Sequence, residues 1–475
     1  MQKNTYHLIS LGCSKNTVDS ESMGQLLSQS GFSPVVDPAQ ANVIIVNTCG
    51  FISPARDESI QVLGELAAEK GDDQYLIAAG CLTQRYGREV AEKVPGIDGL
   101  LGTRRWMDII DVIQKLRRRK HPEPVYQLPD TPKTIVEQPG ILRSAVQGTS
   151  AYLKIADGCR RPCAFCSIPL IKGTAVSRPI ESILEEVSYL QAQGMRELIL
   201  IAQDTTDYGH DLGMKNGLAV LLEQMIETLN AEKSTHQAGE GNTKWIRIMY
   251  AYPGYVTDRL IDVMATHEQI VPYLDIPLQH ADPGVLRQMR RPANIEWVYT
   301  TLENMREKMP DLALRTTFII GYPGETEKEF QTLLDFVEEI RFDKVGAFQF
   351  SFESGTFSEA LGDPVPNDVK QERWERLMAV QQQISLERNQ ALVGKTLDVL
   401  IEGQGDGLSL GRTYRDAPEI DGLAIVEGEY PSGLMIPVRI TDAMAYDLHG
   451  IPESDWPNFI GSSSVIDLKI EQDGS

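Results

Sequence analysis

The sequence predicts an α/β protein in three parts: an N-terminal open α/β domain with a parallel sheet, a central partial (β/α) barrel, and a small all-β barrel at the C-terminus. Three observations lead to this fold class. Short apolar runs rich in β-branched residues alternate with helical periods over most of the chain. Residues 395–475 hold short alternating runs and Gly-rich turns instead. The length of 475 residues leaves room for about three domains of ~100–200 residues each.

Strands and helices alternate in the first part. We expect strands at residues 6–11, 43–46 and 75–79, and helices up to residue 27, at 54–70 and near 88–94. A cysteine follows each strand, namely Cys13, Cys49 and Cys81. The functional crevice of an open α/β sheet lies outside the carboxyl ends of its strands, so the three thiols should meet there if the strands are neighbours.

A linker is expected next, because Pro122, Pro124, Pro129, Pro132 and Pro139 break any helix. The βα rhythm then resumes, with six strands expected at residues 152–156, 197–202, 245–250, 273–276, 314–320 and 345–350, and with helices between them, for example at 180–193 and 327–339. Residues 230–244 are polar and should form a surface insertion.

The C-terminal part follows a long polar helix expected at residues 367–393. Strands are expected at residues 397–401, 423–426, 435–440 and 465–470. This pattern of short strands and turns predicts a small all-β barrel.

Charge and composition narrow the function. The net charge of −22 and the pI of about 4.8 argue against a general nucleic-acid binder, because an acidic protein repels phosphate backbones. The N-terminus shows no signal peptide, and no apolar run reaches the ~18 residues that span a bilayer. We therefore expect a cytoplasmic protein, in which six cysteines indicate metal ligation or catalysis more than disulfides.

A second set of cysteines, Cys159, Cys163 and Cys166, forms a C-x3-C-x2-C run directly after the first barrel strand. Three thiolates on a four-iron cluster leave one iron open, and that iron can chelate S-adenosylmethionine (SAM). Phe165 would lie against the adenine. Gln203, at the end of a strand, and Gly321, in a Gly-rich turn, are further candidates for SAM contact, although the turn at Gly321 could equally be a tight βα connection. A zinc site is the alternative, but such sites favour paired C-x2-C elements with a fourth Cys or His.

The motifs resemble those of the radical SAM methylthiotransferases over essentially the whole chain. The resemblance is carried by the C-x3-C-x2-C run and by Ser-Leu-Gly-Cys-Ser-Lys-Asn at residues 10–16, Asn-Thr-Cys-Gly-Phe-Ile at 47–52, Ala-Gly-Cys-Leu at 79–82 and Tyr-Leu-Lys-Ile-Ala-Asp-Gly-Cys at 152–159. It implies an N-terminal methylthiotransferase domain at residues 4–118, a linker at 119–144, a radical SAM core at 145–388 and a TRAM domain at 389–470. It also implies two 4Fe-4S clusters, one on Cys159, Cys163 and Cys166 and a second on Cys13, Cys49 and Cys81.

Within this family, one branch modifies an adenosine of tRNA, and the other, the RimO type, modifies the β-carbon of an aspartate in protein S twelve of the small ribosomal subunit. Residues 201–209, 275–282 and 416–422 resemble the second branch. Residues 395–475 also hold five Lys and Arg against fifteen Asp and Glu. An acidic domain fits a basic ribosomal protein better than it fits tRNA.

The resemblance implies that the first cluster cleaves SAM to a radical that takes hydrogen from the aspartate, and that the second cluster supplies the methylthio group. The implied partners are an electron donor such as flavodoxin or ferredoxin and a sulfur source, with no membrane contact and a monomeric enzyme. The alternatives are a methylthiotransferase acting on a tRNA adenosine and, in another class, a non-enzymatic iron-sulfur RNA-binding or assembly module.

Overall fold

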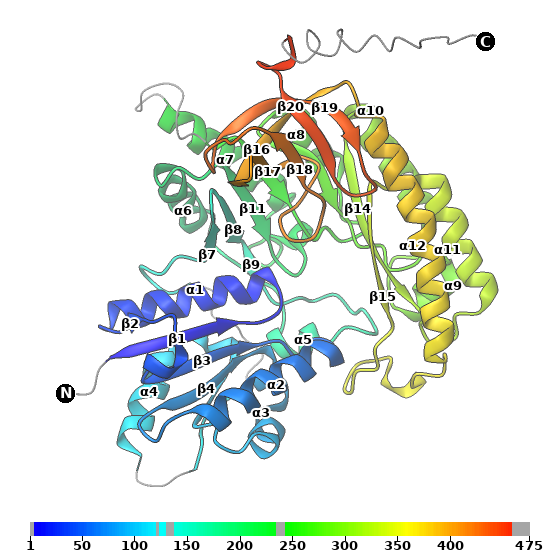
Figure 1. The fold of residues 1–475 in the computed structure, drawn as a ribbon. Coiled ribbons are helices and arrows are strands. Elements are labelled where there is room, and N and C mark those ends of the chain that lie inside the picture. The colour runs from blue at the N-terminus through cyan, green and yellow to red at the C-terminus, as the bar shows by residue number, and fades with distance from the viewer. Residues whose placement is uncertain (1–3, 120–122, 130–136, 234–242, 458–475) are drawn as a thin grey trace, which may run out of the picture.

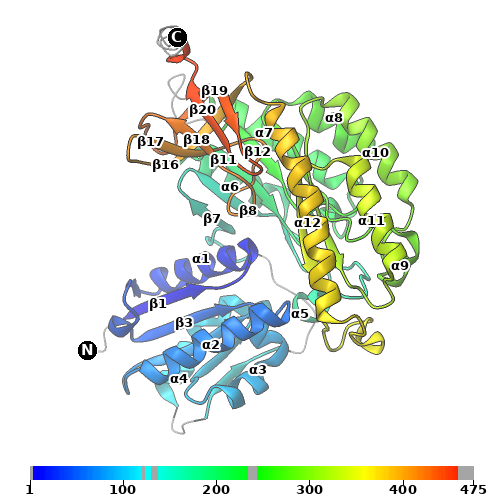
Figure 2. The ribbon, with the colours of Figure 1, turned by 45° about the vertical axis from the view of Figure 1, so that its right-hand side comes forward.

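Three bodies follow one another in space in the same order as in the sequence. The computed structural model describes residues 4–119, 123–129, 137–233 and 243–457. The N-terminal domain lies at one end, the central barrel in the middle and the C-terminal barrel at the other end, in both views of the ribbon (Figures 1 and 2).

The N-terminal domain is a parallel six-stranded sheet in the order β2-β1-β3-β4-β5-β6. Its strands are β1 (Thr5–Ser10), β2 (Ser33–Pro34), β3 (Val43–Thr48), β4 (Tyr75–Gly80), β5 (Gly99–Gly102) and β6 (Val125–Gln127). Its helices are α1 (Ser14–Gln29), η1 (Pro38–Gln40), α2 (Ser53–Glu69), α3 (Cys81–Lys93), η2 (Thr103–Asp108) and α4 (Ile109–Arg118). Apolar side chains of α1 and α4 cover one face of the sheet, and those of α2 and α3 cover the other. The domain is therefore a doubly covered parallel sheet, which explains why its central strands β3 and β4 are mostly apolar and buried.

The three expected N-terminal strands are confirmed, and β1, β3 and β4 are neighbours. The helix expected near residues 88–94 is wrong in its start, because α3 begins seven residues earlier, at Cys81. Gly80 makes this abrupt strand-to-helix turn with a φ of 101°, in the region that favours glycine. The stretch expected as a linker also contributes β6 to the edge of the sheet, beside β5.

The central domain is an open, curved sheet of seven strands in the order β15-β14-β13-β12-β11-β8-β7. Six strands are parallel and β7 is an antiparallel edge, which agrees with the expected partial barrel. The strands are β7 (Ser144–Gln147), β8 (Ser150–Lys154), β11 (Glu197–Ile201), β12 (Trp245–Ile248), β13 (Ile270–Asp275), β14 (Ala313–Ile320) and β15 (Lys344–Gln349), with the short ribbon β9 (Ala156–Asp157) and β10 (Val176–Ser177). The helices are α5 (Ile168–Lys172), α6 (Ile180–Ala192), η3 (Thr205–Asp207), α7 (Gly217–Lys233), α8 (Asp258–Thr266), α9 (Pro283–Gln288), α10 (Ile295–Lys308), α11 (Glu327–Ile340), η4 (Glu359–Leu361) and α12 (Asn367–Gln390).

The C-terminal domain is a closed five-stranded barrel in the order β16-β17-β18-β20-β19. Its strands are β16 (Thr396–Gly405), β17 (Leu408–Thr413), β18 (Ala424–Glu427), β19 (Met435–Ala443) and β20 (Leu448–Pro452). The expected small β-barrel is confirmed, whereas the expected strand at residues 465–470 and most of the insertion at 230–244 lie outside the described residues.

Buried ion pairs attach the C-terminal barrel to the strand starts of the central domain. Arg412 on β17 donates to Glu197 at the start of β11 (2.6 Å), and Arg247 on β12 donates to the same carboxylate (2.7 Å). Lys344 at the start of β15 pairs with Asp416 at 2.8 Å. The segment at residues 416–422 therefore holds two domains together, at the end of the central barrel that is remote from the carboxyl ends of its strands.

A second buried network joins the N-terminal domain to the central barrel. Asp19 on α1 accepts from Arg143 and Lys154 at 2.6 Å each and from Lys172 at 2.8 Å. Lys154 and Lys172 also lie 3.4 and 3.3 Å from Asp157. All five side chains are buried. Because an isolated buried charge is costly, each of these groups depends on the others for its place.

In the described part of the chain, no helix is long and apolar enough to cross a membrane.

Replacing Asp19 by Asn should destabilise the protein strongly. The change leaves three buried cations with one carboxylate, and breaking a buried pair costs about 3–5 kcal/mol. The denaturation midpoint in urea should fall well below that of the wild type. Glu21→Gln removes an exposed carboxylate from the same helix and is the matched control. Equal midpoints for the two variants would show that the network contributes nothing.

Docking of the C-terminal barrel should weaken in acid. The guanidinium groups of Arg247 and Arg412 outweigh burial and hold the pKa of Glu197 at about 2, below its ordinary value of 4.5. The stabilisation from ionised Glu197 is therefore complete above pH 4.5 and disappears as the pH falls toward 2. The free energy of unfolding should decrease by about 3 kcal/mol over this range. The difference in stability between wild type and Glu197→Gln should shrink across that window. Glu427→Gln, on the exposed face of β18, should show no such change; a constant difference for Glu197→Gln would refute the assignment.

Candidate active site between two sets of cysteines

The N-terminal cysteines meet at the carboxyl edge of the first sheet, as the sequence predicted. Cys13 directly precedes α1, Cys49 follows β3, and Cys81 is the first residue of α3. Gly12 allows this close approach: a Cβ placed on it would lie 2.8 Å from the Cβ of Cys49 and 3.0 Å from its sulfur. The N-termini of α1 and α3 therefore point toward the thiols, an arrangement that favours negative charge.

The other three cysteines lie in the loop between β9 and α5 of the central domain. The backbone N–H of Arg161 donates to the sulfur of Cys159 at 3.4 Å. The sulfur of Cys163 lies 3.6 Å from the hydroxyl of Tyr252 and accepts from Arg291 at 3.6 Å. Donors thus already surround sulfur atoms of this loop, which is typical of sites that stabilise thiolates.

All six cysteines line one cavity of about 420 Å³ between the N-terminal and central domains. Other residues that line it are Lys15, Asn16, Phe51, Arg161, Phe165, Ile168, Lys172, Gln203, Tyr250, Ala251, Tyr252, Pro277, Gln279, Arg291 and Phe348. The cavity thus combines six thiols, four cations and several aromatic rings. Two separate sets of three cysteines, far apart in sequence, face a single reaction space.

Burial raises the pKa of several of these thiols. The pKa of Cys81 rises to about 12 and that of Cys159 to about 11, while burial also raises the pKa of Cys49 and of Cys166. Without a metal these thiols are protonated at neutral pH. Iron would have to displace the protons, so ligation releases protons and depends on pH.

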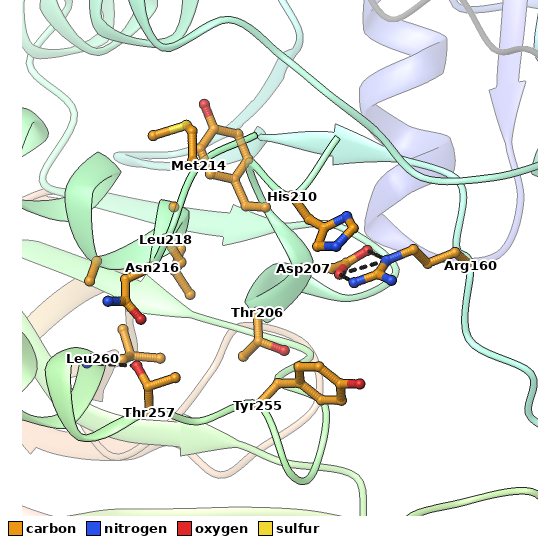
Figure 3. A pocket seen from close by; sticks show the side chains of 13 residues that line it. Arg160, Thr206, Asp207, His210, Met214, Asn216, Leu218, Tyr255, Thr257 and Leu260 are labelled. Carbon is orange, nitrogen blue, oxygen red and sulfur yellow. Dashed lines mark hydrogen bonds and ion pairs between the residues drawn. The ribbon is translucent and has the colours of Figure 1, made fainter. Parts of the chain in front are cut away.

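Salt bridges hold the central cysteine loop in place. Arg160, which follows Cys159, makes a two-pronged pair with Asp207 on η3, at 2.8 and 2.6 Å. Figure 3 shows this pair at the side of a smaller pocket of about 160 Å³. Arg161 reaches Asp204 at 2.6 Å and lies over the ring of Tyr255, with 3.6 Å between the guanidinium carbon and the ring centroid. The loop is therefore fixed to the segment after β11 by ion pairs and to the segment after β12 by stacking.

The structure brings some of the predicted SAM residues together and leaves one apart. Phe165 and Gln203 line the cavity, and the amide of Gln203 donates to Asp157 at 3.1 Å. The side-chain carbonyl oxygen of Gln203 is buried and has no hydrogen-bond partner among the described residues. Gly321 does not line the cavity. Its φ of 71° and the close packing of Lys370 against it match a tight βα turn, so its contact with SAM stays a prediction.

Sequence reasoning missed the cavity residues that come from other parts of the chain. Lys172, Tyr252 and Arg291 lie outside the motifs quoted above, and Lys15 lies inside the motif at residues 10–16 but received no role from it. The place of all four in the cavity becomes visible only once the two domains are packed together. The sequence signal that could have found Lys15 is its position two residues after Cys13.

Three protein families match successive parts of the chain. Uncharacterized protein family UPF0004 matches residues 5–102, the Radical SAM superfamily matches residues 153–337, and the TRAM domain matches residues 393–452. Each match falls within one of the three bodies of the fold.

Similar proteins align with nearly the whole chain. The ribosomal protein uS12 methylthiotransferase RimO of Chloroflexus aurantiacus is 48% identical over 461 residues, which are 94% of this chain and 99% of that protein. The protein of the same name from Roseiflexus sp. is 44% identical over 470 residues, 94% of this chain and 96% of that one. The chain belongs to the family of ribosomal protein uS12 methylthiotransferases. It is thus a radical SAM transferase, which overturns the alternative of a non-enzymatic iron-sulfur module.

Solved structures show the same fold at low identity. The radical SAM methyltransferase TsrM from Kitasatospora setae, with cobalamin and a [4Fe-4S] cluster bound, superposes with a TM-score of 0.56 at 12% identity. The match covers 86% of this chain and 81% of that one. Membership of the radical SAM family accounts for SAM and a 4Fe-4S cluster as cofactors.

The family match favours an iron-sulfur cluster over a single metal ion. Among the residues that the structure describes, no three His, Cys, Asp or Glu side chains are placed to hold one metal ion. Each cysteine of an iron-sulfur cube binds a different iron, so its ligands stand farther apart than those around a zinc ion.

Removing either set of cysteines should halve the bound iron. After anaerobic reconstitution the wild type should hold about eight irons per chain, and Cys159→Ala/Cys163→Ala/Cys166→Ala should hold about four. Cys13→Ala/Cys49→Ala/Cys81→Ala should also hold about four, because the two sets lie on separate domains. Iron analysis and the visible absorption spectrum measure this. A wild type with only about four irons would show that one set is structural.

Proposed function

We propose that this chain attaches a methylthio group to the β-carbon of an aspartate in ribosomal protein uS12, in the reducing cytoplasm. One observation carries the proposal: both sets of cysteines line the same cavity. An enzyme that breaks a carbon–hydrogen bond and puts sulfur in its place needs the radical source and the sulfur source beside one carbon atom. The relatives named for this reaction cover 94% of the chain.

The six thiols would hold two 4Fe-4S clusters, one on Cys159, Cys163 and Cys166 and one on Cys13, Cys49 and Cys81. When bound, these clusters and SAM supply the radical chemistry and the sulfur, which protein side chains do not provide. The protein itself supplies position and a dry site. Rings from both domains surround the cavity, among them Phe51, Phe165, Tyr250 and Tyr252.

Gln203 and Phe165 are suited to hold SAM. The side-chain carbonyl oxygen of Gln203 is a buried acceptor that no other described residue satisfies, and its amide is fixed by Asp157. An ammonium group of a ligand would satisfy this oxygen. Phe165, directly before Cys166, offers an apolar surface within the same cavity for the adenine ring.

The negative net charge of the chain supports a basic protein as the substrate, but through the long-range electrostatic field of the whole protein and not through contacts of the segment at residues 416–422. The segment at residues 416–422 is occupied in domain contacts, and the C-terminal barrel covers the strand starts, away from the cysteines. A net charge of −22 attracts a Lys- and Arg-rich ribosomal protein through its overall field. The same field repels tRNA, which disfavours the adenosine alternative.

The proposal includes partners that the fold does not contain. A flavodoxin or ferredoxin would donate electrons, and a separate sulfur source would refill the N-terminal cluster. We propose that the enzyme works as a monomer, because one chain brings all six cysteines to one cavity.

The reaction can be followed by mass spectrometry of a substrate peptide. The reconstituted wild type, incubated anaerobically with SAM, a reductant and a peptide that spans the target aspartate of uS12, should increase the peptide mass by about 46 Da, the replacement of H by SCH3. Cys13→Ala/Cys49→Ala/Cys81→Ala should still form 5′-deoxyadenosine but give no such product. Methylthiolated adenosine in tRNA, with unchanged peptide, would instead establish the tRNA reaction.

A further inference from the structure

We infer that the Lys15 ammonium binds the side-chain carboxylate of the substrate aspartate and so selects an acidic residue and positions its β-carbon. This inference rests on the proposed function and deepens it, since it assigns a residue to the choice of substrate. Lys15 is the second residue of α1 and lines the cavity between the two sets of cysteines.

Lys15 lies in the cavity and forms no ion pair with another residue that the structure describes. The residue is 9% exposed, and its Nζ lies 3.1 Å from the centroid of the Tyr250 ring. Among the described residues, no carboxylate lies within ion-pair distance of it. An aromatic ring stabilises an ammonium but replaces only part of its hydration, so a buried ammonium of this kind favours an incoming anion.

The other cations that line the cavity are already engaged. Arg161 pairs with Asp204 and Asp207, and Lys172 pairs with Asp19 and Asp157. Arg291 donates to the carbonyl oxygen of Pro277 and to the sulfur of Cys163, and its guanidinium lies over Tyr252. Lys15 is thus the cavity cation that is best placed to accept a ligand carboxylate.

Tyr250 fixes the position of this ammonium. Its φ of 61° is left-handed, which is uncommon for a residue with a bulky side chain. The conformation is held by its N–H, which donates to Asp275 at 3.1 Å, and by its carbonyl, which accepts from Thr205 at 3.1 Å. Strain of this kind persists where the surroundings over-determine it and is concentrated at functional sites. Here it presents the ring to Lys15.

The location of Lys15 indicates which carboxylate it would take. It lies two residues from Cys13, on the side of the set proposed to hold the sulfur. The carbon that accepts the methylthio group must approach this side. In an aspartate the carboxyl carbon is bonded directly to the β-carbon, so an ammonium that fixes the carboxylate also fixes the reacting atom. An asparagine in the same place would offer no charge to Lys15.

The test compares peptide binding between matched pairs. Dissociation constants are measured by fluorescence anisotropy for the reconstituted full chain and two labelled uS12 peptides, one with the target Asp and one with Asn. The wild type should prefer the Asp peptide by roughly 10- to 100-fold, the range for a hydrogen bond to a charged group. Lys15→Met should bind both peptides alike, and Lys15→Arg should recover part of the preference. Lys93→Met makes the same change of net charge on the exposed end of α3 and should keep the full preference.

The outcomes separate this inference from the proposed function. A wild type that methylthiolates the peptide, together with a Lys15→Met variant that keeps the preference for Asp, overturns the role of Lys15 and leaves the function standing. Weaker binding of SAM to Lys15→Met with an unchanged peptide preference means that the anion on Lys15 belongs to SAM, and this too overturns the inference. A wild type with neither product nor preference for Asp overturns both.

Discussion

The structure depends on one buried carboxylate, that of Asp19. It comes from α1 of the N-terminal domain and is held by Arg143, Lys154 and Lys172 of the central domain. Because α1 begins directly after Cys13, and because α5, which ends at Lys172, follows the central cysteine loop, the same contact sets the separation of the two sets of thiols. A change in this pairing would move one cluster site relative to the other. Buried ion pairs contribute little to stability when compared with apolar contacts, but they define one arrangement among many.

The network also has an electrostatic consequence for the site. Three cations surround two carboxylates, so the group keeps a surplus of positive charge. Lys172 lines the cavity, and its charge lowers the pKa of Cys81 against the larger effect of burial. The N-termini of α1 and α3 add partial positive charge from the same side. Thiolates that hold an anionic cluster are thereby compensated without a direct ion pair to each sulfur.

The sequence predicted the meeting of the N-terminal thiols because local patterns in the sequence are enough to place them. Apolar runs located the strands, each cysteine followed one of them, and parallel neighbours bring their ends together. The start of α3 was missed because the conformation of Gly80 decides it. The role of Asp19 could not be predicted, since its partners Arg143 and Lys172 are more than a hundred residues away. The docking of residues 416–422 could not be predicted either, because its partners Lys344 and Arg315 belong to another domain, the central barrel.

The C-terminal barrel closes the strand starts of the central barrel, and packed side chains from Val18 through Tyr273 to Ala417 fill the interior between the two ends. The cavity that the cysteines line lies between the first two domains, and its volume of about 420 Å³ is within the range of small-molecule sites, so a substrate polypeptide can enter it only with a short segment. A folded ribosomal protein can offer such a piece only as a narrow loop that projects from its surface. The shape of the cavity therefore favours an aspartate on a projecting loop over one on a flat or broad surface, before any chemical contact is made.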